Sequence, residues 1–126
     1  MTSKYKKNKI LAEFKNTVEN MLAENTEYDC LDDMGRDCSV CIDSGCDVIM
    51  DLYVTREYDL ESFTFAHYID GDARQPDPIV RMYMDKETGQ LRTGYYDDCF
   101  PMQTYTDDEN NVISFLELWT HNLIHN

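Results

Sequence analysis

The chain has 126 residues and carries 11 Lys and Arg against 25 Asp and Glu, a formal net charge of −14. The length fits one domain, residues 1–126, with a hydrophobic core of its own. The charge disfavours nucleic acid as a direct ligand and favours basic protein partners, although acidic residues that only keep a protein soluble would give the same composition.

The charge is distributed unevenly along the chain. Residues 1–15 contain five Lys and one Glu, a net of +4, and residues 16–126 have a net of −18. The basic start is not followed by the apolar core of a secretory signal, and no segment approaches the roughly 20 apolar residues of a membrane span. We therefore expect a cytoplasmic protein without membrane contact, and a monomer is favoured.

The pattern of apolar residues predicts an α+β domain. An apolar stripe at three- and four-residue intervals predicts a helix over residues 4–25, with Asn25 as its end. Alternating residues in 48–105 predict an antiparallel meander of four to five strands, with a turn at Gln75–Pro78 and a hairpin at Lys86–Gly89. Thr106 to Glu109 has the form of a capping box, so a second helix over 106–125 is expected to pack on the sheet. The helical stripes comprise Ile10, Leu11, Phe14, Val18, Met21 and Leu22, and Val112, Phe115, Leu116, Trp119 and Leu123.

Four of the five cysteines lie in residues 26–47, where periodicity disappears. In the cytosol such a cluster favours metal over disulfides, and Cys38-Ser-Val-Cys41 has the spacing of a zinc knuckle. We expect this segment to be an irregular loop ordered by one structural zinc ion, with unbound thiols or redox pairing of Cys38 with Cys41 as alternatives. The predicted ligands are Cys30, Cys38, Cys41 and Cys46, with Cys99 and His67 in reserve and Cys99 the main alternative to Cys30.

The sequence gives little sign of catalysis. The zinc deaminase pattern, phosphate-binding glycine loops and a serine nucleophile elbow are absent. We expect a protein that is not an enzyme.

Pairs of acidic residues and neighbouring tyrosines suggest a surface that contacts a partner. Carboxylates can occupy the positions that a partner's Lys and Arg reserve for DNA phosphates, and tyrosines can anchor such a contact, although solvated turns are the simpler explanation. The predicted contact residues are Asp32, Asp33, Asp70, Asp72, Tyr95, Tyr96, Asp97 and Asp98.

These features together give two resemblances. A small, acidic chain with a cysteine knuckle and tyrosine-rich strands resembles the phage-encoded anti-CRISPR proteins, specifically a zinc-containing inhibitor of the type II CRISPR effector nuclease. That resemblance implies stoichiometric binding that blocks target DNA loading in a bacterial host cell. Separately, Tyr68-Ile69-Asp70-Gly71-Asp72 followed by Asp77-Pro78 and Arg81-Met82-Tyr83 is similar to a pattern in small domains of bacterial mobile elements. The alternative function is a zinc-stabilised adaptor or structural module, phage or plasmid encoded, that binds another basic host protein.

Overall fold

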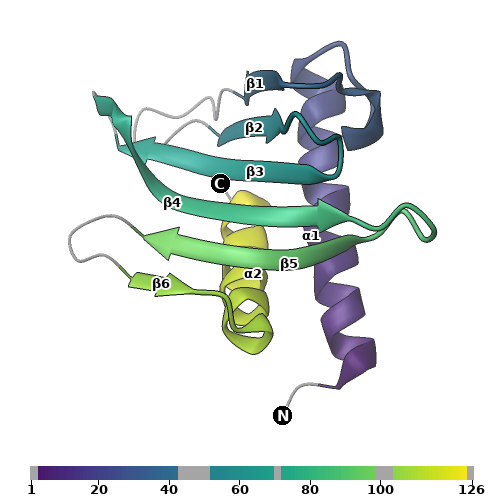
Figure 1. Cartoon of the computed structure of the whole chain (residues 1–126), viewed down its shortest axis with the longest axis vertical. Coiled ribbons are helices and arrows are strands. Elements are labelled where there is room, and N and C mark those ends of the chain that lie inside the picture. Colours follow the sequence, from purple (N-terminus) through teal and green to yellow (C-terminus); the bar gives the residue numbers. More distant parts are fainter. Residues whose placement is uncertain (1–2, 43–51, 70–71, 99–103, 125–126) are drawn as a thin grey trace.

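The structure is a computed structural model that describes residues 3–42, 52–69, 72–98 and 104–124. Its described part is a two-layer α+β arrangement in which both helices lie on one face of an antiparallel sheet (Figure 1). The strands follow one another in chain order across the sheet, so the predicted meander is confirmed, with six strands instead of four or five. The elements are α1 (Lys4–Asn25), the 3₁₀ turn η1 (Leu31–Asp33), β1 (Cys38–Ile42), β2 (Leu52–Arg56), β3 (Ser62–Ile69), β4 (Asp72–Met84), β5 (Leu91–Asp98), β6 (Thr104–Thr106) and α2 (Glu109–Ile124).

The first helix has the predicted bounds. The Ser3 hydroxyl caps its start by accepting from the Lys6 amide at 3.1 Å, and the Thr26 amide closes its end on the Leu22 carbonyl at 2.8 Å. Five members of its predicted stripe are buried, and Met21 packs against them half-buried.

The second helix begins three residues later than predicted. Asp108, not Thr106, caps it, because the Asp108 carboxylate accepts from the Asn111 amide at 3.2 Å. Thr106 ends β6, and its hydroxyl accepts from the Asp108 amide at 3.2 Å. The helix therefore begins at Glu109, and the predicted start at residue 106 is wrong.

The prediction of an irregular loop over residues 26–47 is wrong for its middle part. Residues 38–42 form β1, which pairs along its whole length with β2. Between Cys38 and Cys41 the segment has a single β-branched residue, Val40, which is too little to predict a strand from the sequence. Pairing with β2 supplies the stabilisation that local preference lacks. Residues 43–47, including Cys46, lie outside the described residues.

The turn predicted at Gln75–Pro78 from its two prolines is also wrong. These residues lie within β4, where Pro76 pairs with Tyr68 beside an irregularity in the β3–β4 register. Proline is tolerated at such irregularities because the regular ladder is already interrupted there. The predicted hairpin at 86–89 is confirmed, with Gly89 at φ 72° and the Gly89 amide bonded to the Asp85 carbonyl at 2.7 Å.

The core lies between the helices and the sheet. Phe14 of α1 meets Phe65 of β3 edge to face, with ring centroids 5.0 Å apart, and lies 5.7 Å from Trp119 of α2. Each pair of this kind adds about 1 kcal/mol to the area it buries. Neither helix of the described part is long and apolar enough to cross a membrane.

Candidate protein-interaction surface

The two cysteines of the predicted knuckle lie on opposite faces of β1. Successive strand residues alternate between faces, so residues three apart point in opposite directions. Cys38 is half-buried on the face of Ile42, and its Sγ lies 3.4 Å from the Tyr28 hydroxyl, whereas Cys41 is exposed on the other face. This strand conformation does not bring the two thiols to one ion, as a knuckle requires.

Cys30 and His67, the other predicted ligands that the structure describes, lie on two further elements. Cys30 is the N-cap of η1, and burial raises the pKa of its thiol. His67 is buried in the core, with its ring 5.0 Å from that of Trp119. Cys46 and Cys99 lie outside the described residues, and within the described ranges no three His, Cys, Asp or Glu side chains are grouped to hold a metal. Zinc binding stays a prediction.

Two acidic segments are joined by one guanidinium. Arg56, at the end of β2, donates to the carbonyl oxygens of Met34 at 2.6 Å and Leu60 at 2.9 Å, and it pairs with the Asp32 carboxylate at 3.2 Å. It thereby fastens the segment that follows α1 to the β2–β3 turn. We call these two segments, residues 24–37 and 56–61, the acidic end; it lies beside the C-terminal end of α1 (Figure 1).

The β2–β3 turn within the acidic end is held in a defined shape. The Asp59 carboxylate accepts from the amides of Glu61 and Ser62 and from the Ser62 hydroxyl, at 2.7 to 2.9 Å. These bonds, led by that from the Ser62 amide, lower the pKa of Asp59. Leu60 has φ 65°, which a branched side chain rarely adopts, so this turn is fixed by its bonds and not by local preference.

The acidic end has a large surplus of negative charge. It contains nine Asp and Glu against Arg36 and Arg56, a net of −7, and eight of the nine acidic residues are exposed. Both guanidiniums are engaged within it, because Arg36 lies over the Tyr58 ring at 4.8 Å and Arg56 binds the backbone. Lys86 of the β4–β5 hairpin pairs with Glu61 at 2.9 Å, so the charge that can attract a basic surface is carried by the other exposed carboxylates of this end.

The predicted contact residues do not form one surface. Asp32 and Asp33 lie in the acidic end, where Asp33 also accepts from the Cys30 amide at 3.3 Å. Tyr95 lies in β5 with its ring 5.5 Å from that of Tyr105, and Tyr96 faces the helices, 4.3 Å from the Phe115 ring. Tyr96 is therefore part of the packing between sheet and helix, and the prediction that it anchors a partner does not fit this position.

The other predicted contact residues are less fully placed. Asp97 is half-buried in β5, and its Oδ1 has no hydrogen-bond partner among the described residues. Asp72 and Asp98 lie at the start of β4 and the end of β5, and Asp70 lies outside the described residues.

Sequence reasoning missed Arg56 and Tyr58. Tyr58 is 70% exposed in the β2–β3 turn, between Glu57 and Asp59 in the sequence. An Asp followed three residues later by Ser, between two alternating runs, was the available signal for this turn.

Comparisons of the chain with protein-family models, with curated proteins and with solved structures each find no match.

Proposed function

We propose that the protein is a stoichiometric inhibitor that binds a basic surface of a nucleic-acid-handling protein through the acidic end. The observation that carries this proposal is the surplus of exposed carboxylates on two segments that Arg56 holds together. A fixed cluster of negative charge raises the encounter rate with a positive groove and penalises acidic partners.

The arrangement of the acidic end supports binding to a protein in particular. Its segments are already ordered by Arg56 and Asp59, so little conformational entropy is lost when a partner binds. Tyr58 supplies a large exposed ring, stacked with Arg36, of the kind that often dominates the energy of an interface.

We further propose the type II CRISPR effector nuclease as the partner, in the cytoplasm of a bacterial host cell. Such nucleases hold their RNA–DNA duplex in a positively charged channel and read the adjacent DNA motif with arginines. A rigid acidic body can compete with DNA at such a surface, which agrees with the resemblance to anti-CRISPR proteins. A structural zinc ion remains part of this proposal, because Cys46 and Cys99 lie outside the described residues.

The experiment is a titration of the protein into a purified type II nuclease with its guide RNA, followed by target DNA cleavage. We expect inhibition that saturates near one inhibitor per nuclease and weakens as salt rises from about 0.05 M to about 0.5 M, because salt screens such contacts. Full cleavage at a tenfold excess of inhibitor at low salt, with several orthologous nucleases, would contradict the choice of partner. Capture of another basic DNA-binding host protein would instead support the adaptor alternative.

Two matched variants test the acidic end itself. The first replaces Glu24, Glu27 and Asp29 with Gln, Gln and Asn, and the second makes the same replacements at Glu87, Glu117 and Asp107. All six side chains are exposed, and each variant loses three negative charges. We expect only the first to weaken binding, by about tenfold; equal weakening would mean that net charge alone acts and would contradict a defined surface.

A further inference from the structure

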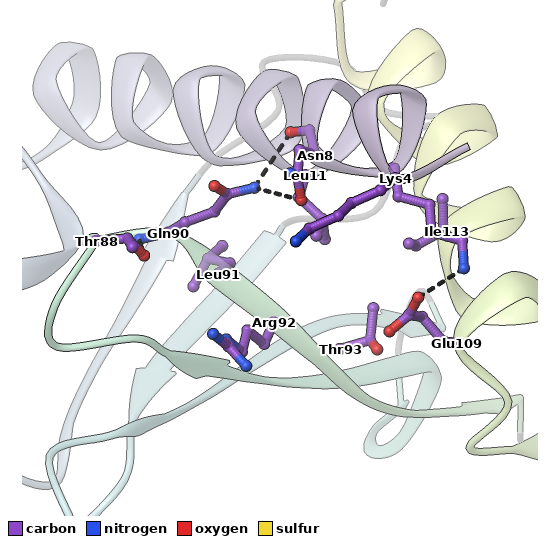
Figure 2. A pocket seen from close by; sticks show the side chains of 11 residues that line it. Lys4, Asn8, Leu11, Thr88, Gln90, Leu91, Arg92, Thr93, Glu109 and Ile113 are labelled. Carbon is purple, nitrogen blue, oxygen red and sulfur yellow. Dashed lines mark hydrogen bonds and ion pairs between the residues drawn. The ribbon is translucent and has the colours of Figure 1, made fainter. Parts of the chain in front are cut away.

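The N-terminal half of α1 helps to form a pocket that the proposed function does not use. The pocket has a volume of about 810 Å³, a size typical of small-molecule sites. Its three walls are the first turns of α1, the chain from Thr88 to Thr93, and the first turns of α2 (Figure 2).

The walls are fastened to one another. The Gln90 side-chain Nε2 donates to the Asn8 carbonyl at 3.3 Å, and the Lys15 ammonium donates to the Gly89 carbonyl at 2.7 Å. Lys7 bridges to Glu109 at 2.8 Å, which joins the starts of the two helices. The pocket is therefore bounded by elements that are already positioned, and a ligand would need little rearrangement.

The lining is positive although the chain is strongly negative. Lys4, Lys7 and Arg92 line the pocket against a single acidic residue, Glu109. Arg92 is paired with Asp85, but Lys4 has no bonded partner among the described residues, and its side chain extends over the pocket in Figure 2. Lys7 uses one ammonium donor on Glu109, which leaves two for a ligand.

The acidic end does not cancel this positive charge. Along α1, Lys4 and Lys7 lie about 30 Å and about 26 Å from Glu24, the first residue of the acidic end, which is about three times the Debye length of about 8 Å in physiological salt. Asp107 and Asp108 lie nearer, before α2, but they do not line the pocket.

The lysines at the start of α1 are unfavourably placed with respect to the helix dipole. The first turn of α1 has no acidic residue and contains Lys4, Lys6 and Lys7, although the positive end of a helix dipole favours carboxylates. Departures from local preference often mark functional positions.

We propose that this pocket binds a small organic anion whose carboxylate or phosphate is held by Lys4 and Lys7. The buried side chains of Leu11, Leu91 and Ile113 lie at its base, so the ligand has a short apolar body beside its charged group. This ligand site is independent of the acidic end.

The test is titration of the ¹⁵N-labelled protein with hexanoate and hexyl phosphate, with inorganic phosphate and hexylamine as comparisons. We expect the amide signals of Asn8, Gln90 and Ile113 to shift with one or both hexyl anions, with a Kd of about 1 mM or lower. The tighter of the two identifies the head group. Shifts that are equally large with hexylamine, or phosphate binding as tight as that of hexyl phosphate, would overturn the proposal, as would no shift at about 10 mM ligand.

Lys6 offers a matched control for Lys4. Both side chains are exposed in the first turn of α1, but Lys6 does not line the pocket. We expect Lys4→Gln to weaken hexyl anion binding about fivefold and Lys6→Gln to leave it unchanged. Both should keep or slightly raise the melting temperature, since each removes a positive charge from a helix start; equal effects of the two variants on binding would overturn the role of Lys4.

Discussion

Arg56 and Met34 are joined by a 2.6 Å hydrogen bond from the guanidinium Nη1 to the backbone carbonyl oxygen. This bond connects the end of β2 to the residue that follows η1. The Arg56 side chain is only 12% exposed, and further bonds to the Leu60 carbonyl make it the link between the two segments of the acidic end.

We therefore predict that Arg56→Ala lowers the free energy of unfolding by about 3 kcal/mol, since bonds to a buried charged donor contribute roughly 1.5 to 3 kcal/mol. Arg56→Lys should recover less than half of this, because an ammonium cannot reach three acceptors in a planar arrangement. Urea unfolding followed by fluorescence of Trp119, the single tryptophan, measures both. A loss below about 0.5 kcal/mol for Arg56→Ala would contradict the linking role.

Gly94 and Gly35 form a matched pair for a second prediction. A Cβ at Gly94 would lie 2.6 Å from the Arg81 carbonyl oxygen and 2.8 Å from Tyr83 Cε2, whereas at Gly35 it meets nothing within 4 Å. Gly94→Ala should cost about 1 to 3 kcal/mol of stability through this overlap. Gly35→Ala should be neutral or stabilising by up to about 1 kcal/mol, because it restricts the unfolded chain. Thermal unfolding of the two variants measures this difference. A lower melting temperature for Gly35→Ala than for Gly94→Ala would contradict the β4–β5 register.

Asp59 gives a prediction of pH dependence. Its pKa is lowered in the folded state, mainly by hydrogen bonds from Ser62, so its contribution to stability is complete above the unfolded value of about 3.9. That contribution is lost as the pH falls through the lower folded value. Asp59→Asn should therefore be less stable than the parent at about pH 7, with the difference shrinking toward about pH 3. The exposed Asp107→Asn variant serves as control, and an unchanged difference across this range would contradict the assignment.

The cysteines of β1 allow the strand and zinc geometries to be separated. In the strand, Cys41 is exposed, so Cys41→Ser should change stability by less than about 0.5 kcal/mol, and Cys38→Ser, beside Tyr28, should cost more. Zinc binding by both thiolates predicts large losses for both variants and about one zinc per chain. Metal analysis of protein purified under reducing conditions, combined with unfolding of both variants, distinguishes the two. Less than about half an equivalent of zinc per chain would contradict the zinc hypothesis.

The start of α2 provides a test of its cap. Asp108→Ala removes the bond to the Asn111 amide and should cost about 1 kcal/mol. Asp107→Ala, one residue earlier and exposed, should cost less than half as much. Hydrogen exchange of the first-turn amides of α2 reports the difference directly. Equal protection in the two variants would contradict Asp108 as the N-cap of α2.

The sequence by itself determined the elements that have a regular apolar period. The stripe from Ile10 to Leu22 predicted α1 to the residue, and alternation predicted an antiparallel meander, because burial on one face imposes periods of 3.6 and 2. It also revealed the opposite charges of the first fifteen residues and the rest of the chain.

Only the tertiary structure decided how weakly patterned segments were used. Strand β1 exists because β2 supplies its hydrogen-bond partners, so Cys38 and Cys41 lie on opposite faces instead of in a knuckle. The acidic end requires Arg56 to bond Met34, 22 residues earlier in the chain, and the pocket requires α1, β5 and α2 together. Such contacts depend on long-range packing, which local propensity and spacing do not encode.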